Sequence, residues 1–91
     1  MEGLVNGMAD NVPGAERYDL RGLKCPLPVL KTRKRMATLA SGTHIWVETT
    51  DPLAVLDIPH FCAEDGHRLV ETQTVEGGNL FLIEKDGAST A

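Results

Sequence analysis

Cys25 is the residue whose type and neighbours most favour chemistry. It stands in a short segment with two prolines, Gly22-Leu23-Lys24-Cys25-Pro26-Leu27-Pro28. Proline fixes φ near the helical value and has no N–H, so it suits the first turn of a helix. Cys25 is therefore expected to open a helix, at a position where Ser, Thr, Asp or Asn would cap better than a thiol. The positive end of the helix dipole favours thiolate over thiol, so the segment predicts a presented sulfur of lowered pKa.

Basic residues gather around Cys25, although the chain as a whole has a formal net charge of −4. Seven of the nine Lys and Arg residues lie between residues 17 and 35. Cations favour a thiolate and attract acidic partner surfaces. We expect Arg21 and Lys24 to tune Cys25, with Gly22 in the turn before it. Three more cations are expected to dock a partner protein, or simply to form a solvated helix face: Lys31, Lys34 and Arg35.

Cys62 is the second thiol and lies in an apolar segment with Ile58, Phe61 and Ala63. Free cysteines are among the most buried residue types, so Cys62 is expected to be a core residue. The alternative is a resolving thiol that closes a disulfide with Cys25, which would make the chain a thiol redox switch.

Histidine, cysteine and aspartate also cluster late in the chain. His60, Cys62 and His67, with Asp57 or Asp65, match no standard zinc spacing, so we expect no metal site. No phosphate-binding loop, paired carboxylates or catalytic triad is visible, and the chain is expected to need no cofactor.

The elements that must position Cys25 follow from periodicity and turn residues. Strands are expected over residues 18–21, 44–49, 68–75 and 79–85, with a Gly77-Gly78 hairpin between the last two. A helix is expected over residues 26–40, with Val29, Leu30 and Met36 on its apolar side. A second helix is expected from Asp51-Pro52 to Asp65, divided or kinked by Pro59 and ended by Gly66.

This order, β-α-β-α-β-β, predicts an α/β fold. Strand–helix–strand crossovers are normally right-handed, so both helices should cover one face of a four-stranded mixed sheet in a two-layer sandwich. The chain of 91 residues allows one small domain. We place that domain at residues 17–86, between a flexible N-terminal tail at 1–16 and a frayed C-terminus at 87–91.

Composition excludes several classes of protein. No apolar run approaches the ~20 residues of a membrane span, so no membrane is expected as a partner. The first sixteen residues lack the basic start and apolar stretch of a secretory signal, which favours a cytoplasmic location and free thiols. Aromatic residues make up only 4% of the chain, too few for a platform that stacks single strands. Direct contact with nucleic acid is not expected, although the basic segment keeps a small RNA-interaction module open as an alternative.

The segment from Arg21 to Pro28 resembles the Gly-Leu-x-Cys-Pro-x-Pro signature of the TusA (SirA-like) sulfur-carrier family. Asp51-Pro52 and the later segment Asp57-Ile58-Pro59 resemble a second stretch of the same family, and the likeness spans roughly residues 18–85. One departure is Leu27, where the best-known carriers have an acidic residue, and it bears on the partner and not on the chemistry.

The resemblance implies a sulfurtransferase that acts as a persulfide carrier. Its donor would be a cysteine desulfurase, its carrier residue Cys25 alone, and its acceptor a downstream protein, most directly in 2-thiouridine formation on tRNA. Related members serve molybdenum-cofactor maturation or sulfur oxidation. The chemistry agrees with the residues, because sulfur transfer proceeds by thiolate attack on a persulfide.

Overall fold

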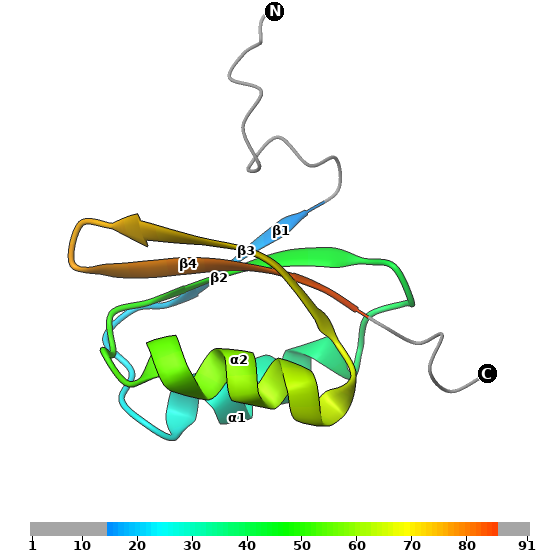
Figure 1. Ribbon diagram of the computed structural model, residues 1–91, viewed down its shortest axis with the longest axis horizontal. Helices are drawn as coiled ribbons and strands as arrows, with labels where there is room; N and C mark the ends of the chain where they lie inside the picture. The colour runs from blue at the N-terminus through cyan, green and yellow to red at the C-terminus, as the bar shows by residue number, and fades with distance from the viewer. Residues whose placement is uncertain (1–14, 86–91) are drawn as a thin grey trace, which may run out of the picture.

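The computed structural model describes residues 15–85, which form four strands and two helices (Figure 1). In chain order these are β1 (Glu16–Leu20), α1 (Leu27–Met36), β2 (His44–Thr49), α2 (Ala54–Asp65), β3 (Arg68–Val75) and β4 (Gly78–Glu84). The predicted order β-α-β-α-β-β is confirmed. Strands β2 and β3 have the expected bounds, and β4 begins one residue before the expected position.

The four strands form one mixed sheet in the order β1-β2-β4-β3. Strand β1 pairs with β2 in parallel, with Leu20 opposite Thr49 at their C-terminal ends. Strand β4 is antiparallel to both of its neighbours, β2 and β3. Because β1 and β2 are parallel neighbours, the loops that follow them emerge at the same edge of the sheet. Both helices therefore begin at that edge.

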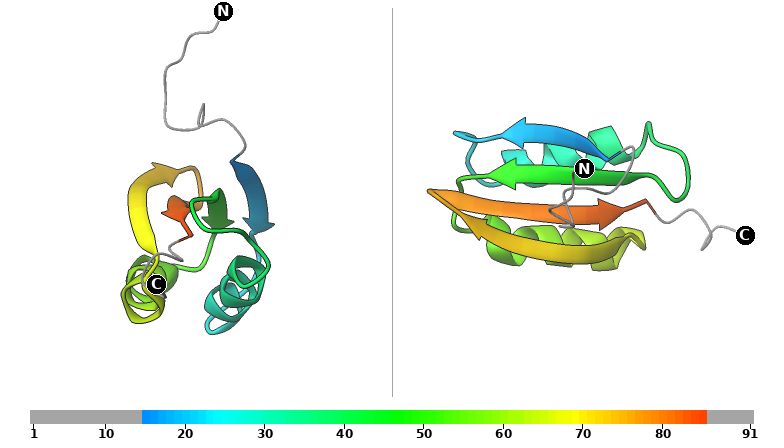
Figure 2. Two further views of the ribbon diagram at one scale, coloured as in Figure 1. Left: turned by 90° about the vertical axis from the view of Figure 1, so that its right-hand side faces the viewer. Right: turned by 90° about the horizontal axis from the view of Figure 1, so that it is seen from above.

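Both helices cover the same face of the sheet, so the predicted two-layer sandwich is confirmed (Figure 2). The core lies between the layers and is made of one buried cluster from five elements: Leu20, Met36, Ile45, Val47, Ala54, Ile58, Phe61, Cys62, Phe81 and Ile83. The strands alternate, so a smaller apolar cluster of Trp46, Leu80 and Leu82 is on the opposite face. No helix among residues 15–85 is long and apolar enough to cross a membrane.

Helix α1 differs from its expected form in length and in the face it buries. The helix ends at Met36 and not at Ala40. At this end the Lys85 ammonium donates a hydrogen bond to the carbonyl of Met36 at 2.6 Å. The buried line of α1 is Pro28, Thr32 and Met36, while Leu30 is 49% exposed. The periodicity predicted that Leu30 faces the core. In the structure the side chains that pack against the sheet are instead those of Pro28, Thr32 and Met36, spaced four residues apart.

Helix α2 starts later than expected and continues without a break through Pro59. The proline removes one backbone donor, yet the helix persists because Ile58, Phe61 and Cys62 on its inner side are buried against the sheet. Gly66 ends the helix in the left-handed conformation, with φ 79°, as the sequence predicted.

Strand β1 begins earlier than expected. Glu16, placed in the tail by the sequence, is its first residue, and the Glu16 carboxylate accepts the Arg35 Nε–H at 2.9 Å. Residues 1–14 of the expected tail and the expected frayed C-terminus at 87–91 lie outside the described residues.

Gly78, at the start of β4, lies very close to the backbone at the end of β2, and a substitution can test this close approach. A Cβ at this position would lie 1.9 Å from the carbonyl oxygen of Thr49, at the end of β2. Gly78→Ala should therefore lower the free energy of unfolding by about 1–3 kcal/mol, measured by urea denaturation. Glu76→Ala, in the exposed turn next to it, should change stability by no more than about 0.5 kcal/mol. Equal midpoints for the two variants would contradict the close approach.

Candidate functional site

Cys25 lies in the loop between β1 and α1, at the edge of the sheet where β1 and β2 end and both helices begin. Gly22 turns the chain with φ 85°, and its N–H donates to the Thr50 hydroxyl at 2.8 Å. The Cys25–Pro26 peptide bond is cis. Helix α1 begins at Leu27 with Pro26 as its capping residue, so Cys25 stands one residue further outside the helix than expected. Its side chain is exposed and its thiol is free.

Two aspartates from the start of α2 hold the Cys25 segment. The Asp51 carboxylate accepts the backbone N–H of Cys25 at 2.6 Å and that of Leu53 at 3.1 Å. The helix expected to start at Asp51-Pro52 begins at Ala54 with Leu53 as its cap residue, so Asp51 supports the turn before α2 and ties the two helix starts together. The Asp57 carboxylate accepts the Cys25 S–H, with 3.2 Å between Sγ and Oδ2.

The carboxylates reverse the expected direction of the Cys25 pKa. The hydrogen bond to Asp57 raises the pKa of the thiol above its ordinary value, and desolvation and the charges of Asp57 and Asp51 act in the same direction. The expectation of a lowered pKa is therefore wrong. The start of α1 offers little compensation, because Pro26 and Pro28 have no N–H and Leu27 donates its own to the Lys24 carbonyl at 2.8 Å.

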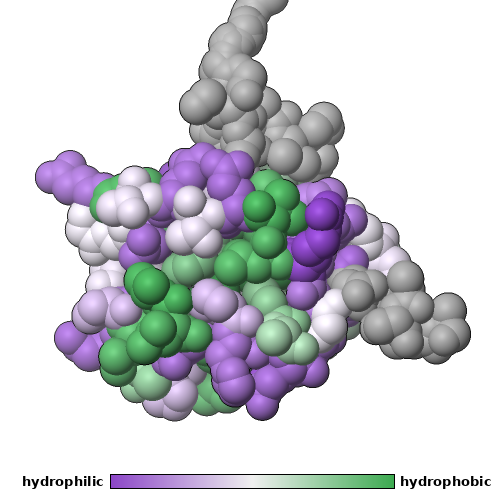
Figure 3. All heavy atoms as spheres, viewed as in Figure 1, coloured by the Kyte–Doolittle hydropathy of each residue, from purple (hydrophilic) through white to green (hydrophobic). Residues whose placement is uncertain are grey.

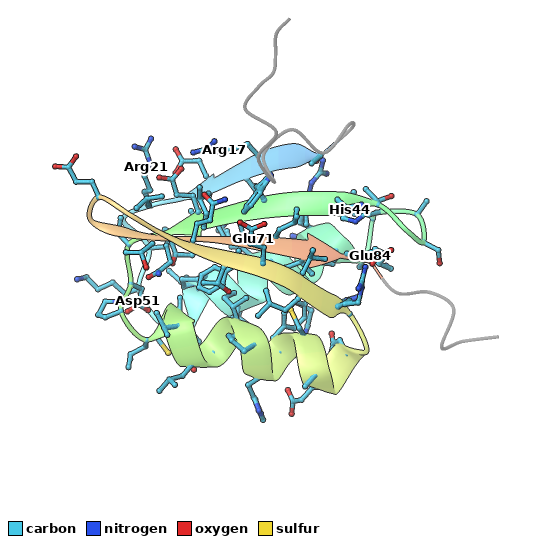
Figure 4. The ribbon with its side chains drawn as sticks, turned by 45° about the horizontal axis from the view of Figure 1, so that its top comes forward. Arg17, Arg21, His44, Asp51, Glu71 and Glu84 are labelled. Carbon is cyan, nitrogen blue, oxygen red and sulfur yellow. The ribbon has the colours of Figure 1, made fainter. Side chains whose placement is uncertain are left out.

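Four of the seven cations between residues 17 and 35, all of them arginines, are paired with acidic residues of the domain. Arg21 forms a bidentate pair with Asp19, at 2.9 and 2.8 Å, and Figure 4 shows it by the end of β1, apart from Asp51 at the start of α2. Arg35 faces Glu16 of β1. Arg33 lies over the Phe61 ring, 5.2 Å from its centroid, with Nε 3.2 Å from Asp65. Within residues 17–35 the ion pairs therefore leave three lysines without an acidic partner among the described residues: Lys24, Lys31 and Lys34.

A shallow groove of about 210 Å³ runs between the two helices from Cys25. Its lining is mostly apolar, and two carboxylates and an imidazole stand along it: Cys25, Pro26, Val29, Asp57, His60, Phe61 and Glu64. The groove opens widely to solvent and is too shallow to enclose a small molecule. It leaves Cys25 Sγ accessible to a reactive group carried by another protein.

Cys62 is in the core, as the sequence predicted. It is only 2% exposed, and burial raises the pKa of its thiol to about 12. A thiol in this state is neither ionised nor reachable at neutral pH, which argues against its use as a resolving partner for Cys25. Nearby, His60 lies 3.4 Å from Glu64, and the His67 ring packs against Phe61 with centroids 5.4 Å apart. Residues 15–85 contain no group of three His, Cys, Asp or Glu side chains that could hold a metal ion.

Asp57 is the site residue that sequence reasoning undervalued. The sequence assigned it no role beside Cys25, whereas its carboxylate contacts the sulfur of that cysteine, 32 residues earlier in the chain. The available clue was its place in the second stretch of resemblance to the TusA family, which also holds Asp51.

The charge of Asp57 makes the reactivity of Cys25 testable. Asp57→Asn removes the carboxylate that most disfavours the thiolate, so the Cys25 pKa should fall and alkylation by iodoacetamide at pH 7 should become faster. The measurement is the alkylation rate as a function of pH. Asp65→Asn makes the same charge change at the far end of α2 and should leave the rate profile close to that of the wild type. An unchanged or higher pKa in Asp57→Asn would contradict the assigned contact.

Comparison with known proteins identifies the family of the chain. Residues 16–85 match the family described as Sulfurtransferase TusA. The sulfur carrier protein TusA of Allochromatium vinosum is 37% identical over 70 residues, which cover 77% of this chain and 92% of the relative. Proteins of the same name from Pseudomonas paraeruginosa and Pseudomonas aeruginosa are 43% identical over 67 residues, which cover 74% of this chain and 85% of each relative. The chain therefore belongs to the TusA family.

Proposed function

We propose that this protein is a sulfur carrier that works as a persulfide sulfurtransferase, with Cys25 as the carrier residue. The observation that carries the proposal is the exposed, free Cys25 thiol at the open end of the groove between α1 and α2. The names of the relatives support the general role of sulfur transfer. The donor in this proposal is a cysteine desulfurase, and the acceptor is a downstream protein, most directly one that forms 2-thiouridine on tRNA. The free thiols favour action in the cytoplasm.

The transfer itself needs no cofactor or net redox change. The Cys25 thiolate attacks the outer sulfur of the donor persulfide, and a new bond forms between the two sulfurs. The bond inside the donor persulfide breaks, and its electron pair leaves with the donor cysteine sulfur. That sulfur takes up the proton that Cys25 gave away. Unloading repeats these steps with the roles changed: a thiolate of the acceptor attacks the outer sulfur of the Cys25 persulfide, and the Cys25 sulfur leaves with the electron pair.

Exposed apolar side chains support handover between proteins. Leu27 and Leu30 of α1 are 43% and 49% exposed, and Leu53 and Leu56 at the start of α2 are 51% and 70% exposed. Figure 3 shows apolar surface over the N-terminal half of α2. Contiguous apolar surface of this kind is typical of protein-binding sites. Both helix starts adjoin Cys25, so a partner seated on this surface would reach the sulfur.

The charged surface of α1 supplies the second part of the docking proposal. Lys31 and Lys34 are exposed, and no ion pair to another described residue engages them, so they remain good candidates for contact with an acidic partner. Arg35 is a weaker candidate than the sequence suggested, since Glu16 already holds its guanidinium. Lys24 is next to Cys25 in the chain, and Gly22, three residues before it, supports the loop through the bond to Thr50. Arg21 is paired with Asp19 instead.

Loading with sulfur tests the carrier residue. After incubation with a cysteine desulfurase and cysteine, the wild type should gain the mass of one sulfur atom in an intact mass spectrum. Cys25→Ser should gain none, because no other thiol is exposed among the described residues. Cys62→Ala, the matched control, should load as the wild type does. A gain of sulfur by Cys25→Ser would overturn the proposal.

Salt dependence tests the docking cations. The double variant Lys31→Gln/Lys34→Gln should load from the desulfurase about tenfold more slowly at low ionic strength, because charges at an interface act mainly on the association rate. The difference should shrink as salt screens the charges. The control is Arg17→Gln/Arg68→Gln, which removes two cations paired with Glu48 and Glu84 on the sheet. Equal slowing in both double variants would assign the effect to net charge and not to α1.

A further inference from the structure

Cys25 is a carrier thiol with a negative neighbour. Asp57 Oδ2 lies 3.2 Å from Cys25 Sγ. The Asp51 carboxylate accepts a hydrogen bond from the backbone N–H of Cys25 at 2.6 Å. Glu64 lines the same groove, but its carboxylate lies 3.7 Å from the Arg33 guanidinium and 3.4 Å from the His60 imidazole. Among the described residues no cation pairs with Asp57. Its charge therefore acts on Cys25 without local neutralisation.

A sulfur carrier must keep its sulfur after it leaves the donor and before it meets the acceptor, while other thiols are present in solution. The loss reaction begins when a thiolate attacks the outer sulfur of the Cys25 persulfide. A bond forms from the attacking sulfur to the outer sulfur, and the bond from the outer sulfur to Cys25 Sγ breaks. The electron pair of the broken bond goes to Sγ, which then takes up the proton that the attacking thiol released. The rate depends on the approach of the attacking anion and on how well Cys25 accommodates negative charge as it leaves.

Resting on the proposed function, we propose that Asp57 retains the carried sulfur by opposing its removal from Cys25 by thiolates that are not part of a docked partner. The carboxylate disfavours the negative charge that develops on Sγ as the sulfur is lost. It also repels an incoming thiolate, since both are anions at the mouth of one groove. Asp57 is half-buried in the first turn of α2, so its carboxylate is held beside Sγ.

The same charge also lowers the fraction of Cys25 thiolate that can attack during loading, so loading differs from loss in its leaving group. In loading, the donor cysteine leaves, and a donor thiol of low pKa leaves readily whatever stands beside Cys25. Cys25, with its raised pKa, is the poorer leaving group of such a pair. Sulfur therefore passes onto Cys25 more readily than a stray thiol removes it.

The test measures the lifetime of the loaded protein. Wild type, Asp57→Asn, Asp57→Glu and Asp65→Asn are loaded with a cysteine desulfurase and cysteine, and the donor is removed. Each is then mixed with either 2-mercaptoethanol, whose attacking thiolate carries one negative charge, or thioglycolate, whose attacking thiolate carries a second charge on its carboxylate, and loss of the extra sulfur is followed by intact mass. Asp57→Asn should lose sulfur about twofold faster than the wild type with 2-mercaptoethanol and about fivefold faster with thioglycolate, where the second negative charge increases the repulsion by Asp57.

The controls separate the possible causes. Asp57→Glu keeps the charge and should decay as the wild type does, and so should Asp65→Asn, in which an equal charge is lost at the other end of α2. Equal lifetimes of wild type and Asp57→Asn would overturn the inference, as would equal acceleration by Asp65→Asn. Asp57→Ser is a second neutral variant, to be used if circular dichroism shows that Asp57→Asn is unfolded. Failure of the wild type to load would overturn the proposed function, whereas normal loading with unchanged lifetimes would overturn this inference alone.

Discussion

The carboxylate of Asp51 joins the starts of the two helices, and the geometry of the site depends on it. It accepts one N–H from Cys25, before α1, and one from Leu53, before α2. The two loops meet because β1 and β2 are parallel neighbours, whose C-terminal ends share one edge of the sheet. A second bond between these loops runs from the Gly22 N–H to the Thr50 hydroxyl. Hydrogen bonds from backbone N–H groups of this loop to side chains therefore hold the Cys25 backbone in place, so its exposed sulfur has a defined position.

The charge around the thiol comes from residues that are distant in the chain. Nearby arginines are neutralised locally or across the fold, Arg21 by Asp19 and Arg35 by Glu16. The charge that reaches Sγ is that of Asp57, brought in by α2. The result is a thiol that stays protonated in the free protein, with an apolar surface beside it where a partner can dock. In the function that we propose, this combination would favour docking of a partner over reaction with free thiols.

Local patterns predicted the elements that depend on local chemistry. The strand at 44–49, the strand at 68–75 and the stop at Gly66 all have the expected positions. Alternation and the glycine conformation determine these features within a few residues of chain. The failures involve packing: Leu30 is exposed, and Pro59 lies inside an unbroken helix. Which line of α1 is buried, and whether α2 survives a proline, are settled by contacts with the sheet, which no local pattern contains.

The sequence by itself determined the family, the order of the elements and Cys25 as the candidate carrier. These follow from the proline spacing, the periodicities and the Gly-Leu-x-Cys-Pro-x-Pro resemblance, all of which are local in the chain. Only the tertiary structure decided the electrostatics of the thiol, reversing the expected direction of its pKa. The physical reason is that charge acts through distance in space. A carboxylate 32 residues away along the chain lies 3.2 Å from Sγ, while Arg21, four residues away in the sequence, is turned towards Asp19.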